Sequence, residues 1–333
     1  MGVATSLVVQ KRHPKTVATI RCAIGPGTDY QWVAAPTAIE LGAPEPGVRL
    51  TAAIDSSCVL AFRPRRDSVR LWSLNHGRRV DIPLRGAPQP LPRWARGVGE
   101  LVEELSSHRR PRVGLEAVVL RENASPGFAS GPALELGLAL ALCRAAEWEQ
   151  ERDDLAQIVH AARRAAGFDC RIEEVQTALA AEEGAALRLS ESSAPTPASL
   201  PEETAFILAV CGDRRVSGGG HTGVRRADPP ADAEERDGSL STLGKLLLAA
   251  GAEDSGGVAD GPLSVLADDL LWAGAAGVRT GEFGRRERVL AVCSVDSAPR
   301  VAAHALSRFH DAGGFEGRAS VYLPAGGATF LAP

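Results

Sequence analysis

The segment Ser125–Ala141, SPGFASGPALELGLALA, constrains the fold of this chain more than any other stretch. A loop of glycine, serine and proline leads directly into an apolar helix rich in leucine and alanine. Such a junction aims backbone N–H groups and the positive end of the helix dipole at one spot, which stabilises an anion such as a phosphate. Pro132 suits the first helical turn, and Ser130 is placed to cap the helix or contact the anion. The alternative interpretation is a capped core helix that binds no ligand, because neither the Walker spacing nor GxGxxG occurs here.

Composition limits the classes of protein to which this chain can belong. Its 333 residues are 44% hydrophobic, enough for a large core and more consistent with two domains than with one. A net charge of −4 gives no basic excess to attract nucleic acid or an anionic membrane. No apolar run approaches the roughly 20 residues of a membrane helix, and the N-terminus lacks the order of a secretory signal. We therefore expect a cytoplasmic protein with no nucleic acid and no membrane as partners.

Apolar periodicity predicts strands and helices along the whole chain. Residues 16–42 are expected to form a strand, a turn at Gly25–Gly27 and a second strand or short helix. The Ser/Pro-rich residues 190–203 predict a linker or exposed loop, and the polar residues 218–237 a mobile loop. Further strands are predicted at 48–62, 69–82, 113–120, 204–211, 289–295 and 319–323, and helices at 94–105, 239–250, 262–276 and 299–312, with two more helices between 147 and 181. The expected domains are residues 1–192 and 203–333.

Four segments, in order, resemble the signatures of the galactokinases of the GHMP (galacto-, homoserine, mevalonate, phosphomevalonate) kinase superfamily. They are IGPGTDYQWVAAPTAIE (24–40), LEAVVLRENASPGFASGPALELGLAL (115–140), GFDCRIEEVQTALAAEEGAALRL (167–189) and GVRTGEFGRRERVLAVCSV (277–295). The resemblance covers nearly the whole chain. It implies an α+β, two-domain GHMP kinase fold with a ligand cleft between the domains, ATP and Mg²⁺ as cofactors, and a sugar or related polyol as the ligand.

The resemblance also implies catalytic and substrate-binding residues. Glu174 aligns with the aspartate of the family's Cys-Gly-Ile-Met-Asp-Gln-Phe run, whereas the family's catalytic arginine aligns with Ile20, one step from Arg21. Glu174 and Arg21 are therefore the catalytic candidates, although one step along a strand turns a side chain to the opposite face. Asp29 and Tyr30 match retained substrate-binding positions. Asp29 is equally typical of an ordinary turn.

The phosphate loop and the third motif match less well. The resemblance implies that Gly127, Ser130, Gly131 and Glu135 bind the cofactor, with Ser130 and Glu135 also near the metal. In the third motif, arginines at 285 and 286 replace glycines, and they are either solvated surface or an anion site. Residues 250–254 contain nothing equivalent to the family's Ser-His segment.

Losses in several motifs at once favour a pseudokinase or repurposed enzyme that binds a nucleotide, sugar or other small polar ligand in the interdomain cleft. One alternative is an active ATP-dependent galactose or small-alcohol kinase that uses Glu174 as its base. Another is a non-catalytic regulator that senses a metabolite. Outside the motifs, His160 is interpreted as structural, Cys22 and Cys170 as inert thiols, and Gly218–His221 as part of the mobile loop.

Overall fold

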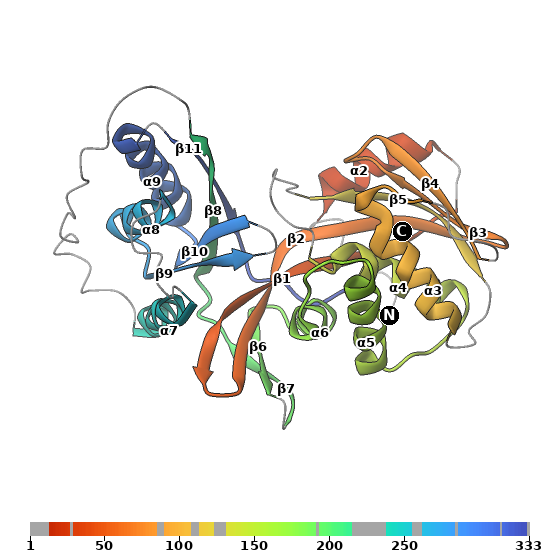
Figure 1. The fold of residues 1–333 in the computed structure, drawn as a ribbon, viewed down its shortest axis with the longest axis horizontal. Helices are drawn as coiled ribbons and strands as arrows, with labels where there is room; N and C mark the ends of the chain where they lie inside the picture. Colours follow the sequence, from red (N-terminus) through yellow and green to blue (C-terminus); the bar gives the residue numbers. More distant parts are fainter. Residues whose placement is uncertain are drawn as a thin grey trace.

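The elements form two β-sheets with helices packed on their faces (Figure 1). Two long strands join the halves, since β1 (Gln31–Glu45) and β2 (Val48–Arg65) pair with each other and run from the first sheet toward the second (Figure 1). This arrangement confirms the α+β class expected from the sequence. The computed structural model describes residues 13–26, 29–84, 90–107, 113–122, 131–190, 193–214, 238–254, 262–283, 286–313 and 315–331.

The first sheet contains eight described strands in the order β12-β1-β2-β5-β3-β4, with β6 beside β2 and β7 beside β6. Strands β3 and β5 are parallel, whereas β1–β2, β2–β5 and β3–β4 are antiparallel pairs. The β3–β4 hairpin turns at residues 74–77, as the Asn-His-Gly pattern predicts. The bounds are β3 (Ser68–Ser73), β4 (Arg78–Pro83), β5 (Gly114–Arg121), β6 (Ala185–Ser190), β7 (Ser193–Ser199) and β12 (Thr329–Leu331).

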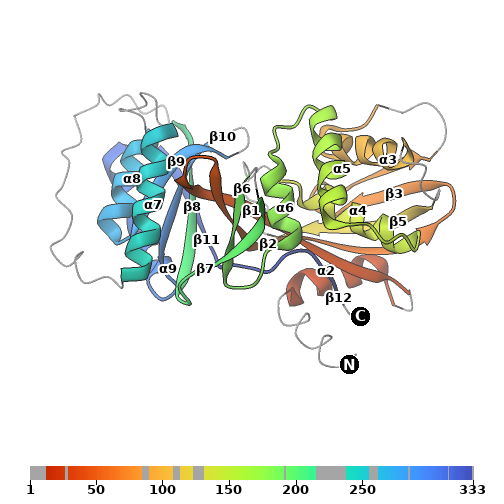
Figure 2. The same ribbon diagram turned by 90° about the horizontal axis from the view of Figure 1, so that it is seen from below.

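Helices cover both faces of this sheet, and the alternation of β2 shows which residues meet them. Leu60 and Phe62 pack into the core formed with α3, α4, α5 and α6, whereas Val59 and Ala61 pack into the core formed with α2 (Figure 2). Helix α4 is buried on nearly all sides, as its continuous apolar run predicts. The bounds are α2 (Pro14–Ile24), η1 (Arg93–Ala95), α3 (Arg96–Ser107), α4 (Ala133–Ala145), α5 (Arg152–Ala165) and α6 (Ile172–Ala180).

The second sheet has the order β11-β8-β10-β9 and packs α8 and α9 on one face. Its other face meets α7 and the ends of β1 and β2, where Phe206 and Leu290 share a core with Ile39, Ile54 and Leu247. This hydrophobic core, one of several in the described residues, therefore contains side chains from both halves of the molecule. The bounds are β8 (Thr204–Arg214), α7 (Gly238–Asp254), α8 (Pro262–Ala273), β9 (Gly277–Phe283), β10 (Arg286–Ser294), α9 (Ala298–Gly313) and β11 (Phe315–Tyr322).

The strand predicted at the start of residues 16–42 is wrong, because Pro14–Ile24 is the helix α2. Its buried residues Val17 and Ile20 are three apart, which fits a helical face, and a proline at its start provides a fixed φ where no N–H is needed. Gly25, with a φ of +79°, ends the helix. The carboxylate of Glu122, at the end of β5, accepts hydrogen bonds from His13 Nδ1 and Thr16 Oγ1 at 2.8 and 2.7 Å and so anchors the first turn.

The linker predicted at residues 190–203 is also wrong over Ser193–Ser199, which form β7. This strand is largely exposed and pairs with β6, and β12 returns from the C-terminus to pair with β1. The last described strand therefore belongs to the first sheet. The division into residues 1–192 and 203–333 stays a prediction, with β12 as the segment that crosses it.

Two further expectations concern membrane helices and the polar loop at residues 218–237. Among the described residues, no helix is long and apolar enough to cross a membrane. The predicted loop at 218–237, including Gly218–His221, lies outside the described residues.

Candidate functional site

The predicted cofactor site begins where β5 ends and α4 starts. Gly127 and Ser130 lie outside the described residues, so their predicted roles stay predictions. Gly131 precedes the helix with a φ of +26°, and Pro132 is its N-cap. The helix that the sequence predicts after this loop is confirmed.

Glu135, in the first turn of α4, is held in a buried ion pair. Arg163 Nη1 on α5 donates to Glu135 Oε2 at 2.7 Å, and the two side chains are only 5% and 3% exposed. A Cβ added to Gly97 on α3 would lie 2.1 Å from Glu135 Oε1, so α3 encloses the other oxygen. A carboxylate closed in by a guanidinium and a helix does not fit the role of a magnesium ligand. The described residues contain no group of three or more His, Cys, Asp or Glu side chains that could hold a metal ion.

Glu174, the predicted base, lies in the first turn of α6 and is partly buried. Burial raises the pKa of its carboxyl to about 7, while the positive charges of Arg163 and Arg171 oppose that rise. A pKa near neutrality suits a group that accepts or donates a proton. Arg163 therefore lies near two carboxylates, bonded to Glu135 and close enough to influence Glu174.

Arg21 does not lie near Glu174. It is exposed on α2, with its guanidinium 5.7 Å from the centre of the Trp32 ring, on the face of the first sheet opposite to α6 (Figure 2). The predicted catalytic pair is therefore not brought together. The strand expected at residues 20 and 21 is wrong, because both belong to the helix α2, so the alternation of side chains along a strand does not apply to them.

Asp29 and Tyr30 lie at the same end of the first sheet as α2. Tyr30 is 8% exposed, packs in the core with Ile20, and has the Arg63 guanidinium 5.2 Å from its ring centre. Asp29 is exposed directly before β1. Glu40 lies eleven residues further along the chain, roughly 35 Å away at about 3.3 Å per residue of strand. The predicted substrate residues therefore lie far from the junction between the halves.

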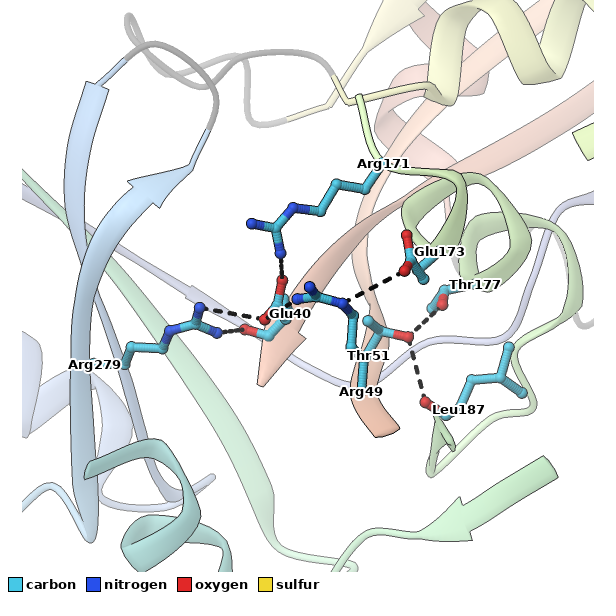
Figure 3. Close-up of polar contacts among 8 residues, drawn as sticks. All are labelled: Glu40, Arg49, Thr51, Arg171, Glu173, Thr177, Leu187 and Arg279. Carbon is cyan, nitrogen blue, oxygen red and sulfur yellow. Dashed lines mark hydrogen bonds and ion pairs between the residues drawn. The ribbon is translucent and has the colours of Figure 1, made fainter. Parts of the chain in front are cut away.

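Three arginines converge on Glu40 at that junction (Figure 3). Arg49 on β2 donates to Glu40 Oε1 at 3.1 Å, and Arg171, the N-cap of α6, donates to Oε2. Arg279 on β9 contacts Oε1 at 3.3 Å and also donates to the Glu40 backbone carbonyl at 3.3 Å. Because Arg279 comes from the second sheet, this network ties the two halves together.

Neighbouring contacts fix the arginines and α6 in place. Arg49 Nε lies 3.4 Å from Glu173 Oε1, and Thr51 on β2 shares a hydrogen bond with Thr177 on α6 (Figure 3). Thr51 Oγ1 also lies 3.3 Å from the Leu187 backbone carbonyl. These contacts join residues that are far apart along the chain, so no local sequence pattern predicts them.

A polar pocket of about 650 Å³ opens beside this network, at the loop between α5 and α6. His160 is oriented there by a contact of 3.1 Å between its Nε2 and the Cys170 carbonyl oxygen. Burial raises the pKa of the Cys170 thiol to about 12, which supports the prediction of an inert cysteine. The lining residues are Arg49, His160, Arg164, Gly167, Phe168, Asp169, Cys170, Arg171, Ile172 and Glu173.

Glu174 gives a testable pH dependence of stability. Its pKa of about 7 in the folded protein lies above the ordinary 4.5, so the folded state holds an extra proton between these values. The free energy of unfolding should therefore lose on the order of 1–3 kcal/mol from this group as the pH rises through that range. We expect Glu174→Gln to remove this loss in urea unfolding at pH 5 and pH 8. The exposed Glu182→Gln is the control, and an unchanged pH dependence in Glu174→Gln would contradict the assignment.

Solved structures with a similar fold are known, although the sequence itself matches little. No protein family model matches the sequence, and no curated protein matches it significantly. The solved structure of Lactococcus lactis galactokinase with galactose has a TM-score of 0.74 and 16% identity, covering 95% of this chain and 99% of that one. Homoserine kinase from Cytophaga hutchinsonii has a TM-score of 0.60 and 15% identity, covering 92% and 99%. Methanococcus jannaschii mevalonate kinase has a TM-score of 0.62 and 12% identity, covering 90% and 100%.

Galactokinase, homoserine kinase and mevalonate kinase are three of the kinases after which the GHMP superfamily is named. At these identities the likeness concerns the fold, since one fold supports several functions. The match nevertheless extends over almost the full length of each chain. The protein therefore has the two-domain fold of the GHMP kinases, as the order of its motifs implied.

Proposed function

We propose that this protein binds a small polar ligand at the junction of its two halves and does not transfer phosphate by the route that the galactokinase signature implies. The observation that carries this proposal is the separation of Arg21 from Glu174 by the first sheet. An acid–base pair must reach the same substrate atom, and even small misplacement lowers the rate strongly.

The Glu135–Arg163 ion pair gives further support. The resemblance to the galactokinase signature makes this glutamate a candidate for a place near Mg²⁺, yet here its carboxylate neutralises a buried guanidinium. Taking it away from Arg163 would leave a buried charge without compensation, at a cost of several kcal/mol. Glu135 is therefore better suited to hold α4 against α5 than to bind a cation.

A thermal-shift panel of sugars, polyols, their phosphate esters and nucleotides tests ligand binding directly. A ligand present at about one hundred times its Kd should stabilise the protein by about 2.7 kcal/mol. We expect at least one sugar, polyol or phosphate ester to raise the melting temperature. A panel in which no compound stabilises the protein would contradict the proposal.

One observation favours a second function, an ATP-dependent galactose or small-alcohol kinase with Glu174 as its base. The pKa of about 7 at Glu174 is that of a group ready to accept a proton near neutral pH. If this function holds, Glu174→Ala should abolish ADP formation while circular dichroism shows a folded protein. Equal turnover in Glu174→Ala and the unmodified protein would exclude this role.

A further inference from the structure

The pocket between α5 and α6 has an arginine-rich lining. Arg49 from β2, Arg164 from the end of α5 and Arg171 from the N-cap of α6 all line it. Two carboxylates, Asp169 and Glu173, line it as well, so the guanidinium groups outnumber the acidic groups. A polar lining of this charge favours an anionic ligand over a neutral one.

Two of these arginines are already arranged for an anion. Arg49 and Arg171 both donate to the carboxylate of Glu40, which shows that their guanidinium groups converge from different elements (Figure 3). Their side chains stay 41% and 50% exposed, so each also has surface open to a solute. A guanidinium has five N–H donors, so the contact of Arg171 with Glu40 and the two contacts of Arg49, with Glu40 and Glu173, leave other donors for a phosphate.

The other lining groups suit hydroxyls. The carboxylates of Asp169 and Glu173, which line the pocket together with Arg171, accept hydrogen bonds from alcohols. The volume of about 650 Å³ falls within the usual range for small-molecule sites. A molecule with one phosphate and several hydroxyls would match both kinds of group.

We propose that this pocket binds a phosphorylated polyol, with the phosphate at the three lining arginines, Arg49, Arg164 and Arg171, and the hydroxyls at Asp169 and Glu173. This inference rests on the proposed function and specifies its ligand as an anion rather than a neutral sugar. Arg171 stands where the galactokinase signature has glycine, so the charge belongs to this chain and not to the signature.

Isothermal titration of the full chain tests this assignment with three probes, galactose 1-phosphate, ribose 5-phosphate and glycerol 3-phosphate. Galactose and inorganic phosphate serve as comparisons. We expect at least one phosphate ester to bind more tightly than either comparison compound. Arg164→Gln and Arg171→Gln should each weaken that binding about tenfold or more, the effect of losing one charge-assisted hydrogen bond. Arg188→Gln is the matched control, because this exposed arginine pairs with Glu45 outside the pocket and should leave binding unchanged.

The outcomes separate this inference from the proposed function. Failure of all three esters to bind, or binding that both arginine substitutions leave intact, overturns the inference. Tighter binding of galactose than of any ester also overturns it, although the proposed function would survive. Phosphorylation of galactose from ATP would instead contradict the proposed function.

Discussion

Replacing Arg163 with methionine should destabilise the protein by about 3–5 kcal/mol, the usual cost of removing one partner of a buried ion pair. Glu135, 3% exposed, would keep a carboxylate without its guanidinium, between α3, α4 and α5. Urea unfolding at neutral pH measures the change. Arg163→Met combined with Glu135→Leu should recover much of the loss, because it replaces both buried charges by apolar groups.

Arg164→Met is the matched control, because Arg164 is the next residue on α5 and its side chain is exposed. Surface substitutions usually change stability by less than about 0.5 kcal/mol. If Arg163→Met cost no more than Arg164→Met, the pair would not be the buried, enclosed contact described for α4. Destabilisation by the double variant as large as that of Arg163→Met would also contradict it.

Replacing Glu40 with glutamine should cost about 2–3 kcal/mol, an estimate from the energy of hydrogen bonds to charged groups. Three guanidinium groups converge on this carboxylate, and without its charge their mutual repulsion is no longer balanced. The loss should be accompanied by weaker coupling of the two sheets, because Arg279 on β9 is one of the three. A double-mutant cycle with Arg279→Gln measures that coupling, expected at about 0.5–3 kcal/mol.

Glu45→Gln offers a control on the same strand. Glu45 is 61% exposed and pairs with Arg188, which is 45% exposed, and such surface pairs contribute about 0–1 kcal/mol. Equal losses of stability in Glu40→Gln and Glu45→Gln would show that the convergence of arginines has no energetic role. A coupling of zero between Glu40 and Arg279 would show that the network does not tie the sheets together.

Most of the fold was predictable because its elements carry strong local patterns. The apolar run of α4, the β3–β4 turn and the strand at Thr204–Cys211 are all confirmed. Helix α2 was missed because its short apolar pattern fits both a helical and a strand period, and the proline in its first turn is the signal that favours a helix. Strand β7 was missed because SAPTPAS has two prolines, which an exposed strand tolerates more readily than a central one.

The site was less predictable because its contacts are not local. Glu40 was only the last residue of a motif, yet it meets arginines from β2, α6 and β9. Arg163 carried no motif at all, and only folding brings it to Glu135. The resemblance gave Glu174 a partner in Arg21, but the sheet separates them, and Arg163 and Arg171 are the arginines that influence Glu174 instead.

Formation of galactose 1-phosphate from galactose and Mg-ATP, followed by ³¹P nuclear magnetic resonance, tests the central claim most directly. That claim is that this chain keeps the GHMP kinase fold without a working arginine–carboxylate pair for phosphate transfer. We predict no product above the background of a sample without protein. Product formed at an ordinary kinase rate of about 1–100 per second would contradict it.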